Sequence, residues 1–253
     1  MSKSSGYRDQ EKIKKMRDAG VICSDIFAQI VKLAQSGAPL IEVDKLAEDL
    51  CRKNRVVPAF KGYEGFPATI CVSPNDVVVH GIPDETILAK GDLLGIDMGI
   101  KYMDVYSDMS ITIPIGNEYR EKSTQHFVDT VKKATLAGID VAVVGNRVGD
   151  IGYAIQSIVE AGGYSVVREM VGHGVGYQLH EDPYIPGFGK PHTGEKLYDG
   201  QTIAIEAIIN QGKRDIFIDG DDGWTTYTED GMLSAIFEHT IVVGESAEIL
   251  TKW

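Results

Sequence analysis

The hydrophobic positions of this chain follow a helical period in four segments and an extended period in most of the others. Apolar residues three to four apart predict helices over about 8–36, 43–54, 118–144 and 148–161. Gly37 and Gly145 separate the members of each pair. Short, often β-branched runs predict strands at 69–73, 76–79, 93–100, 105–115, 164–170, 202–210, 214–218, 224–228 and 232–243. Helix pairs alternating with groups of strands are typical of an α+β domain.

A faint internal repeat appears when the segment after Gly37 is aligned with the segment after Gly145. Apolar positions then coincide, Val43 with Ile151, Ala47 with Ile155 and Leu50 with Ile158. Two such halves would form one curved sheet backed by helices, although two glycine-interrupted helix pairs can also align by chance. No linker or low-complexity segment divides the chain, so we expect one domain over 8–253 after a flexible terminus at 1–7.

Two carboxylates interrupt the apolar runs at the middle of the chain. The runs 93–100 and 105–115 predict a hairpin with its turn around residues 102–103. In that register Asp97 lies directly opposite Asp108, on one face of the sheet. A carboxylate inside an apolar strand costs several kcal/mol to bury unpaired, so each is expected to have a cation nearby.

Three further polar residues stand in similar surroundings. His173 lies between two glycines, while Glu206 and Glu238 lie inside the runs 202–209 and 236–243. An isolated acidic residue on a strand more often faces solvent or pairs with Lys or Arg. None of these acids has an obvious basic partner in the sequence, however, and together with the two Asp they make an oxygen-rich set that suits a pair of divalent ions. His239, beside Glu238, is an even choice between a core residue and a support for that ligand.

The order of these residues resembles type I methionine aminopeptidases, of the pita-bread family, from about Tyr7 to Leu250. Each supporting motif is weak alone, but together and in this order they are specific. They are Gly62–Pro67, Val79–Asp84, Gly172–Gly174, Leu179–Pro183 and Asp221–Trp224. The resemblance implies an α+β pita-bread fold, a curved antiparallel sheet backed by two pairs of helices with internal pseudo-twofold symmetry. It also implies a dinuclear-metal aminopeptidase that removes the N-terminal methionine of nascent proteins when the second residue is small.

The resemblance also implies a role for each candidate ligand. Asp97 would hold one metal, His173 and Glu206 the other, and Asp108 and Glu238 both. Glu206 would in addition take a proton from the attacking water and pass it to the leaving amine. The ligand set suits Co, Mn, Fe or Zn, and metal availability decides among them.

The remaining site residues also come from the resemblance. His180 would stabilise the developing oxyanion and His80 would hydrogen-bond the scissile nitrogen. A small apolar pocket for the methionine side chain would be lined by Phe60, Tyr63, Phe66, Cys71, His80, Leu179, His180 and Trp224. A monovalent cation, Na⁺ or K⁺, would be held by Asn75, Val77 and Ser234. Taken singly, a loop His or aromatic residue is as often a packing residue as a functional one.

Four single positions, and the segment 185–188, depart from what relatives usually carry. Asp104 stands in the hairpin turn in place of Gly, and because Asp tolerates a left-handed backbone we expect the turn to survive. Ala207 replaces Pro after Glu206 and is expected to loosen that strand edge. Val79 replaces Cys and Leu179 replaces an aromatic residue. These changes bear on fine specificity rather than on the reaction.

Composition limits the partners and the compartment. The net charge of −12 argues against a nucleic acid as the main partner, although a local basic patch could still meet a ribosome transiently. The three cysteines lack CxxC spacing and predict free thiols in a reducing compartment. No targeting or membrane-spanning run appears, so we expect a cytoplasmic protein without membrane contact. We also expect a monomer, although the sequence itself does not give the oligomeric state.

Two other functions remain open. A proline-specific relative such as aminopeptidase P or prolidase would carry a large extra N-terminal domain, for which there is no room before residue 8. A pita-bread binding module without activity would typically have lost metal ligands, whereas all five persist here.

Overall fold

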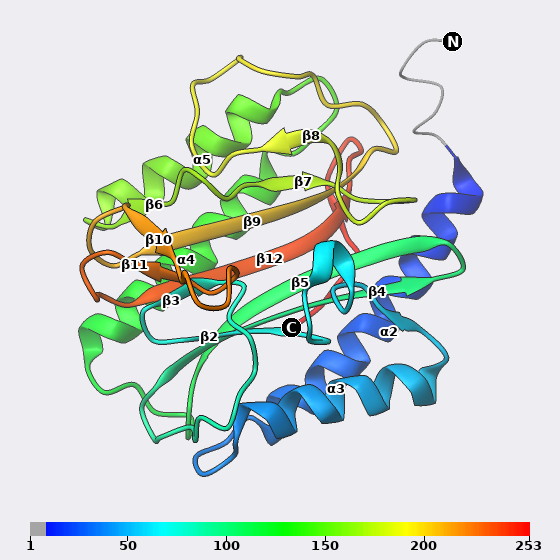
Figure 1. Ribbon diagram of the computed structural model, residues 1–253. Coiled ribbons are helices and arrows are strands. Elements are labelled where there is room, and N and C mark those ends of the chain that lie inside the picture. The colour runs from blue at the N-terminus through cyan, green and yellow to red at the C-terminus, as the bar shows by residue number, and fades with distance from the viewer. Residues whose placement is uncertain (1–8) are drawn as a thin grey trace.

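The computed structural model describes residues 9–253, in which four α-helices lie on one side of a large sheet (Figure 1). They are α2 (Gln10–Leu33), α3 (Leu40–Asn54), α4 (Lys122–Asp140) and α5 (Val148–Ala161). The sequence predicted all four, with the largest error at the ends of α4. The flexible terminus predicted at 1–7 lies outside the described residues.

The large sheet is antiparallel and has ten strands. Its main order is β1 (Val57–Pro58), β4 (Leu93–Tyr102), β5 (Val105–Pro114), β12 (Ser234–Val242), β9 (Thr202–Asn210), β7 (Gly172–Gly174) and β8 (Glu181–Ile185). Three short strands attach to it, β2 (Cys71–Pro74) to β4, β6 (Ser165–Val166) to β9 and β13 (Glu248–Ile249) to β12. The predicted curved sheet backed by two helix pairs is confirmed.

A second sheet of three strands, β10 (Ile216–Ile218), β11 (Thr226–Thr228) and β3 (Val77–Val79), packs against the large one (Figure 1). Val78 and Val79 of β3 form an apolar cluster with Ile208 of β9 and Ile236 of β12. Because side chains alternate along a strand, Ile208 and Ile236 lie on the same face as Glu206 and Glu238. The small sheet therefore lies beside the two glutamates, on the face opposite the helices.

The two halves of the chain repeat each other in local detail. Gly37 and Gly145 both have positive φ, 90° and 95°, and their N–H groups donate to the carbonyls of Leu88 and Leu197. The helix after each glycine packs its apolar face inward, α3 against α2 and α5 against α4. Of the aligned apolar positions, only Ile158 is partly exposed. The halves join where β5 pairs with β12, which confirms the predicted pseudo-twofold arrangement.

The central hairpin differs from its predicted register. Its turn is Met103 and Asp104, both with positive φ (44° and 67°), so Asp97 pairs with Ser110 and not with Asp108. The predicted face-to-face pairing of the two aspartates is therefore wrong, because the turn lies one residue later than predicted. A shift by two positions keeps both side chains on one face, and they become diagonal neighbours. Asp104 adopts the left-handed backbone expected of it.

Strands β7 and β9 also differ from expectation. Residues Gly172–Gly174 gave no strand signal, yet they form β7, because the two glycines let its backbone approach β8 and β9 closely. A Cβ at Gly172 would lie 2.6 Å from the carbonyl oxygen of Ala204, and one at Gly174 would lie 2.3 Å from that of Asp182. The expected loosening at Ala207 is wrong, since that residue is fully buried and pairs in register with Phe237.

The thiol prediction is confirmed, since all three cysteines are buried and unpaired. Among residues 9–253 there is no helix with the length and apolar character needed to cross a bilayer.

Candidate metal centre and substrate pocket

Five neighbouring strands each contribute one of the predicted ligands. One row across the sheet is formed by paired residues, and it runs through Asp97, Ser110, Glu238 and Glu206. The next row contains Gly99 opposite Asp108 and, at its far end, Ala204 opposite His173. The hydroxyl of Thr240 joins β5 to β12 between them, accepting from Asp108 N (2.9 Å) and donating to Asp108 O (2.8 Å). The pairing register thus places all five side chains on one face.

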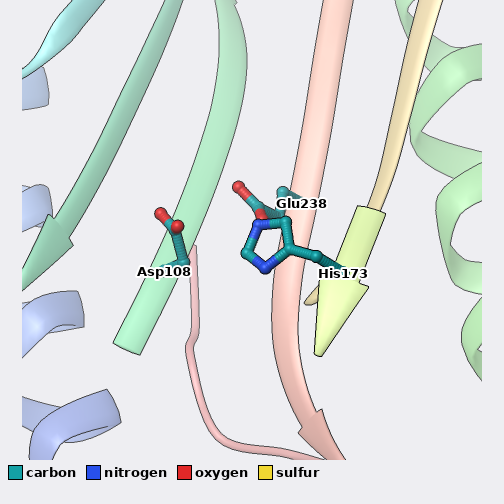
Figure 2. Close-up of side chains that lie close together, drawn as sticks. All are labelled: Asp108, His173 and Glu238. Atoms are coloured by element: carbon teal, nitrogen blue, oxygen red, sulfur yellow. The ribbon is translucent and has the colours of Figure 1, made fainter. Parts of the chain in front are cut away.

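Three of the five converge most closely. Ligand atoms of Asp108, His173 and Glu238 all lie within 4.8 Å of one another, and Figure 2 shows these side chains turned toward a common point from β5, β7 and β12. Asp97 and Glu206 do not belong to this group, but they line the same cavity of about 380 Å³.

The carboxylates of this cluster lack positive partners. No Lys or Arg forms an ion pair with any of the four within residues 9–253, and the buried oxygens Asp97 Oδ1 and Asp108 Oδ1 have no hydrogen-bond partner. Burial raises the pKa of Asp108 to about 7, and burial together with the charge of Asp108 raises that of Glu206 to about 8. Burial and the neighbouring acids also raise the pKa values of Asp97 and Glu238 well above their usual range. Divalent cations would satisfy both the orphaned oxygens and the repulsion, so the residues fit them.

His173 is oriented to bind through one ring nitrogen. Its Nδ1 lies 2.9 Å from the carbonyl oxygen of Gly174, which can only accept, so Nδ1 carries the proton and Nε2 has its lone pair available. Burial lowers the pKa of this imidazole to about 4, which keeps the ring neutral near pH 7. A neutral, oriented imidazole is the form that ligates metals.

The two predicted catalytic histidines both line the cavity. The Nδ1 of His180 lies 2.8 Å from the hydroxyl of Tyr63, and its ring packs edge-on against that of His173 at 4.4 Å between centroids. His80 has a positive φ of 59°, and burial lowers its pKa to about 4. Gly81 follows it because a Cβ there would lie 1.9 Å from the carbonyl oxygen of Val72, so β2 fixes the position of His80.

One wall of the cavity is apolar. All the predicted substrate residues line it, namely Phe60, Tyr63, Phe66, Cys71, His80, Leu179, His180 and Trp224. Most of the apolar ones form a single cluster, in which the rings of Phe66 and Trp224 meet edge-on at 5.2 Å. Gly99 marks where this wall meets the acids, since a Cβ there would lie 2.9 Å from Phe60 and 3.3 Å from Asp108 Oδ1.

The cavity also contains residues that sequence reasoning missed. They are Glu64, Val79, Glu169, Met170, Val171, Tyr184 and Ile208. Ile208 could have been found, because it follows Glu206 by two positions on one strand and shares its face. The others lie in loops or short strands whose placement the pattern does not give.

His239 and the candidate residues for a monovalent cation lie outside the cavity. His239 lies on the face opposite Glu238, where its ring stacks on that of Trp253 with 3.9 Å between centroids and its Nδ1 lies 3.0 Å from Thr251 Oγ1. It is therefore a packing residue and not a support for the ligand. Of the three residues predicted to hold a monovalent cation, Asn75 and Ser234 are adjacent, since Ser234 N donates to Asn75 O at 2.8 Å.

Comparison with known proteins gives consistent matches. The model of metallopeptidase family M24 matches residues 14–245. The methionine aminopeptidase of Clostridium acetobutylicum is 39% identical over 246 residues, which are 96% of this chain and 97% of the relative. Methionine aminopeptidase 1 of Bacillus subtilis is 40% identical over 238 residues, 94% of this chain and 95% of the relative. A crystal structure of methionine aminopeptidase from Thermotoga maritima matches with a TM-score of 0.94 and 38% identity, covering 98% of this chain and 99% of the other.

Proposed function

This chain belongs to metallopeptidase family M24 and, within it, to the methionine aminopeptidases, and from that premise we propose the metals, residue roles and substrates of its reaction. Two divalent ions would be held at the acidic end of the cavity. Asp97 would hold one ion, His173 and Glu206 the other, and Asp108 and Glu238 would contribute to both. The observation that carries this proposal is the pair of buried, partnerless oxygens on Asp97 and Asp108.

The reaction is hydrolysis of the first peptide bond. When bound, the ions polarise the carbonyl and make water a strong nucleophile near neutral pH. Glu206 takes the proton of the attacking water and delivers it to the leaving amine. The Tyr63 hydroxyl donates to His180 Nδ1, so that Nε2–H donates to the developing oxyanion, while His80 hydrogen-bonds the scissile nitrogen.

Substrate selection follows from the two ends of the cavity. The wall formed by Phe60, Phe66, Leu179 and Trp224 accepts an unbranched thioether. Such a pocket favours Met over Leu by about 1–3 kcal/mol. The acids beside this wall crowd the second residue, which therefore has to be small. Asn75, Val77 and Ser234 hold a monovalent cation, Na⁺ or K⁺.

The enzyme acts as a monomer in the cytoplasm on nascent chains, with a transient ribosome contact and no membrane. Its metals are drawn from Co, Mn, Fe and Zn according to supply. These statements extend the family assignment, and native mass spectrometry of the metal-loaded protein would report both the metal count and the oligomeric state.

A peptide assay separates this function from its alternatives. The protein, stripped with chelator and reloaded with Mn²⁺ or Co²⁺, is given Met-Ala-Ser, Met-Leu-Ser and Xaa-Pro peptides, with the Asp108→Asn variant in parallel. We expect methionine release from Met-Ala-Ser only, about two metals per chain in the wild type and loss of activity in the variant. Cleavage of Xaa-Pro peptides would favour a proline-specific enzyme, and inertness with intact metal binding would favour a binding module.

A further inference from the structure

Lys12 is a buried lysine that the proposed reaction does not use. It lies near the start of α2 and is only 5% exposed, and burial lowers its pKa. Lysines are rarely this buried without a partner. Its Nζ lies 3.9 Å from Glu181 Oε2 and 5.4 Å from the centroid of the Tyr177 ring. Tyr177 lies within, and Glu181 directly after, one short segment.

That segment, residues 175–180, connects β7 to β8, and we call it the His180 loop. It contains the proposed catalytic residue His180 and follows the strand that carries the proposed ligand His173. The start of α2 contacts the middle of the loop and the residue directly after it. Asp9 caps α2 with one carboxylate oxygen and accepts the Tyr177 hydroxyl with the other, at 2.9 Å.

The C-terminal end of the loop is held through Glu181. Its Oε2 pairs with Lys12, while its Oε1 accepts the N–H of Gln178 at 2.9 Å. The loop also fits around the lysine, because a Cβ at Gly176 would lie 2.3 Å from Lys12 Nζ. The ion pair thus fixes the backbone on one side of His180, and the Tyr63 hydroxyl fixes its ring on the other.

Removing the lysine distinguishes a structural role from a positioning one. Replacing one member of a buried ion pair leaves the partner's charge without its counterion and is destabilising. If Lys12 served folding alone, Lys12→Met would therefore lower the free energy of unfolding but leave kcat of the folded enzyme unchanged. We propose that Lys12 is a positioning residue which, through Glu181, holds the His180 loop so that His180 faces the reacting carbonyl. This inference rests on the proposed function, in which His180 stabilises the oxyanion.

Kinetics of four variants test it. Lys12→Met, the control Lys14→Met, His180→Ala and the double variant Lys12→Met/His180→Ala are compared with wild type on Met-Ala-Ser with Mn²⁺. Lys14 is exposed and lies two residues on, about 200° around the helix. We expect Lys12→Met to lower kcat about tenfold with KM within about twofold, because small misplacements of a catalytic group are costly. In the His180→Ala background the same change should alter kcat less than about twofold.

Hydrogen exchange of the metal-free protein supplies a readout independent of activity. We expect faster exchange in residues 174–181 of Lys12→Met, with α3 unchanged. An equal loss of kcat in both backgrounds, or an unchanged kcat in Lys12→Met, would overturn the inference and leave the proposed function standing. If the wild type fails to cleave Met-Ala-Ser, the proposed function fails. In that case the exchange data still test the inference, because unchanged exchange in the His180 loop of Lys12→Met would show that the Lys12–Glu181 pair does not hold the loop.

Discussion

Asp108→Asn is expected to stabilise the protein without metal and to weaken it with metal. Asp108 is 3% exposed, its Oδ1 has no hydrogen-bond partner, and it lies among other acids. Asparagine has nearly the same shape and carries no charge. The substitution therefore removes repulsion from the metal-free cluster and removes a ligand from the loaded one.

The magnitude follows from the shifted pKa of this carboxyl. Burial raises it from 3.8 to about 7, and each pKa unit is worth about 1.4 kcal/mol. Between those values the folded chain keeps a proton that the unfolded chain has lost, so stability present at low pH is lost as the pH rises. Because neighbouring acids share the protons, we expect the variant to exceed wild type by about 2–4 kcal/mol at pH 8, and by nearly nothing near pH 4.

Bound metal is expected to make the wild type more stable than the variant. An ion present at a thousand times its Kd stabilises the folded state by about 4 kcal/mol, and the variant lacks one ligand that the wild type has. Urea unfolding in chelator at pH 8 and pH 4 measures the effect of the charge on stability, and unfolding at pH 8 with Mn²⁺ measures the effect of the metal. Asp25→Asn, on the exposed side of α2, serves as the control. A variant less stable than wild type in chelator at pH 8, or one that gains as much from Mn²⁺, would refute the reasoning.

Three further outcomes are expected. His180→Ala should lower kcat on Met-Ala-Ser by about 10²–10³-fold, as loss of an oxyanion donor does, and steady-state rates equal to wild type would contradict its role. Gly172→Ala should weaken metal binding about tenfold or more in calorimetric titration, because its Cβ would lie 2.6 Å from Ala204 O and displace β7; unaltered affinity would count against this. Ile155→Ala should lower the free energy of unfolding, measured in urea, by about 2–5 kcal/mol, because Ile155 is fully buried. Tyr153→Ala, at a position that is 50% exposed, should change this free energy by less than about 0.5 kcal/mol. Equal effects of these last two substitutions would show that α5 does not pack as described.

The helices and long strands could be predicted because their residues carry a regular period. Val148–Ala161 was predicted with the ends that it has, since Gly145 and the apolar spacing both mark it. The hairpin turn was predicted at residues 102–103 and lies at Met103 and Asp104, because Met103 carries no signal that would fix its place within the turn. Strand β7 was missed because the close approach of neighbouring backbones, and not side-chain pattern, makes it a strand.

The candidate site was predicted as a set of residues but not as a geometry. Nothing in the sequence states that β12 lies between β5 and β9, and that order brings Glu238 beside both Asp108 and Glu206. The sequence also could not give the role of Lys12, whose partner Glu181 is far along the chain. The alternation of side chains along a strand would have added Ile208 to the predicted site. The positions of the missed loop residues are set by tertiary contacts, which the sequence pattern does not give.

The position of β12 has a consequence for how activity arises during synthesis. This strand is made after β5 and β9, yet it inserts between them and supplies the central glutamate of the cluster. Until it docks, the edges of β5 and β9 have no common neighbour and the acids on them are not gathered. A nascent copy in which β12 has not yet docked would thus be inert, and the peptidase stays silent until this strand has been made.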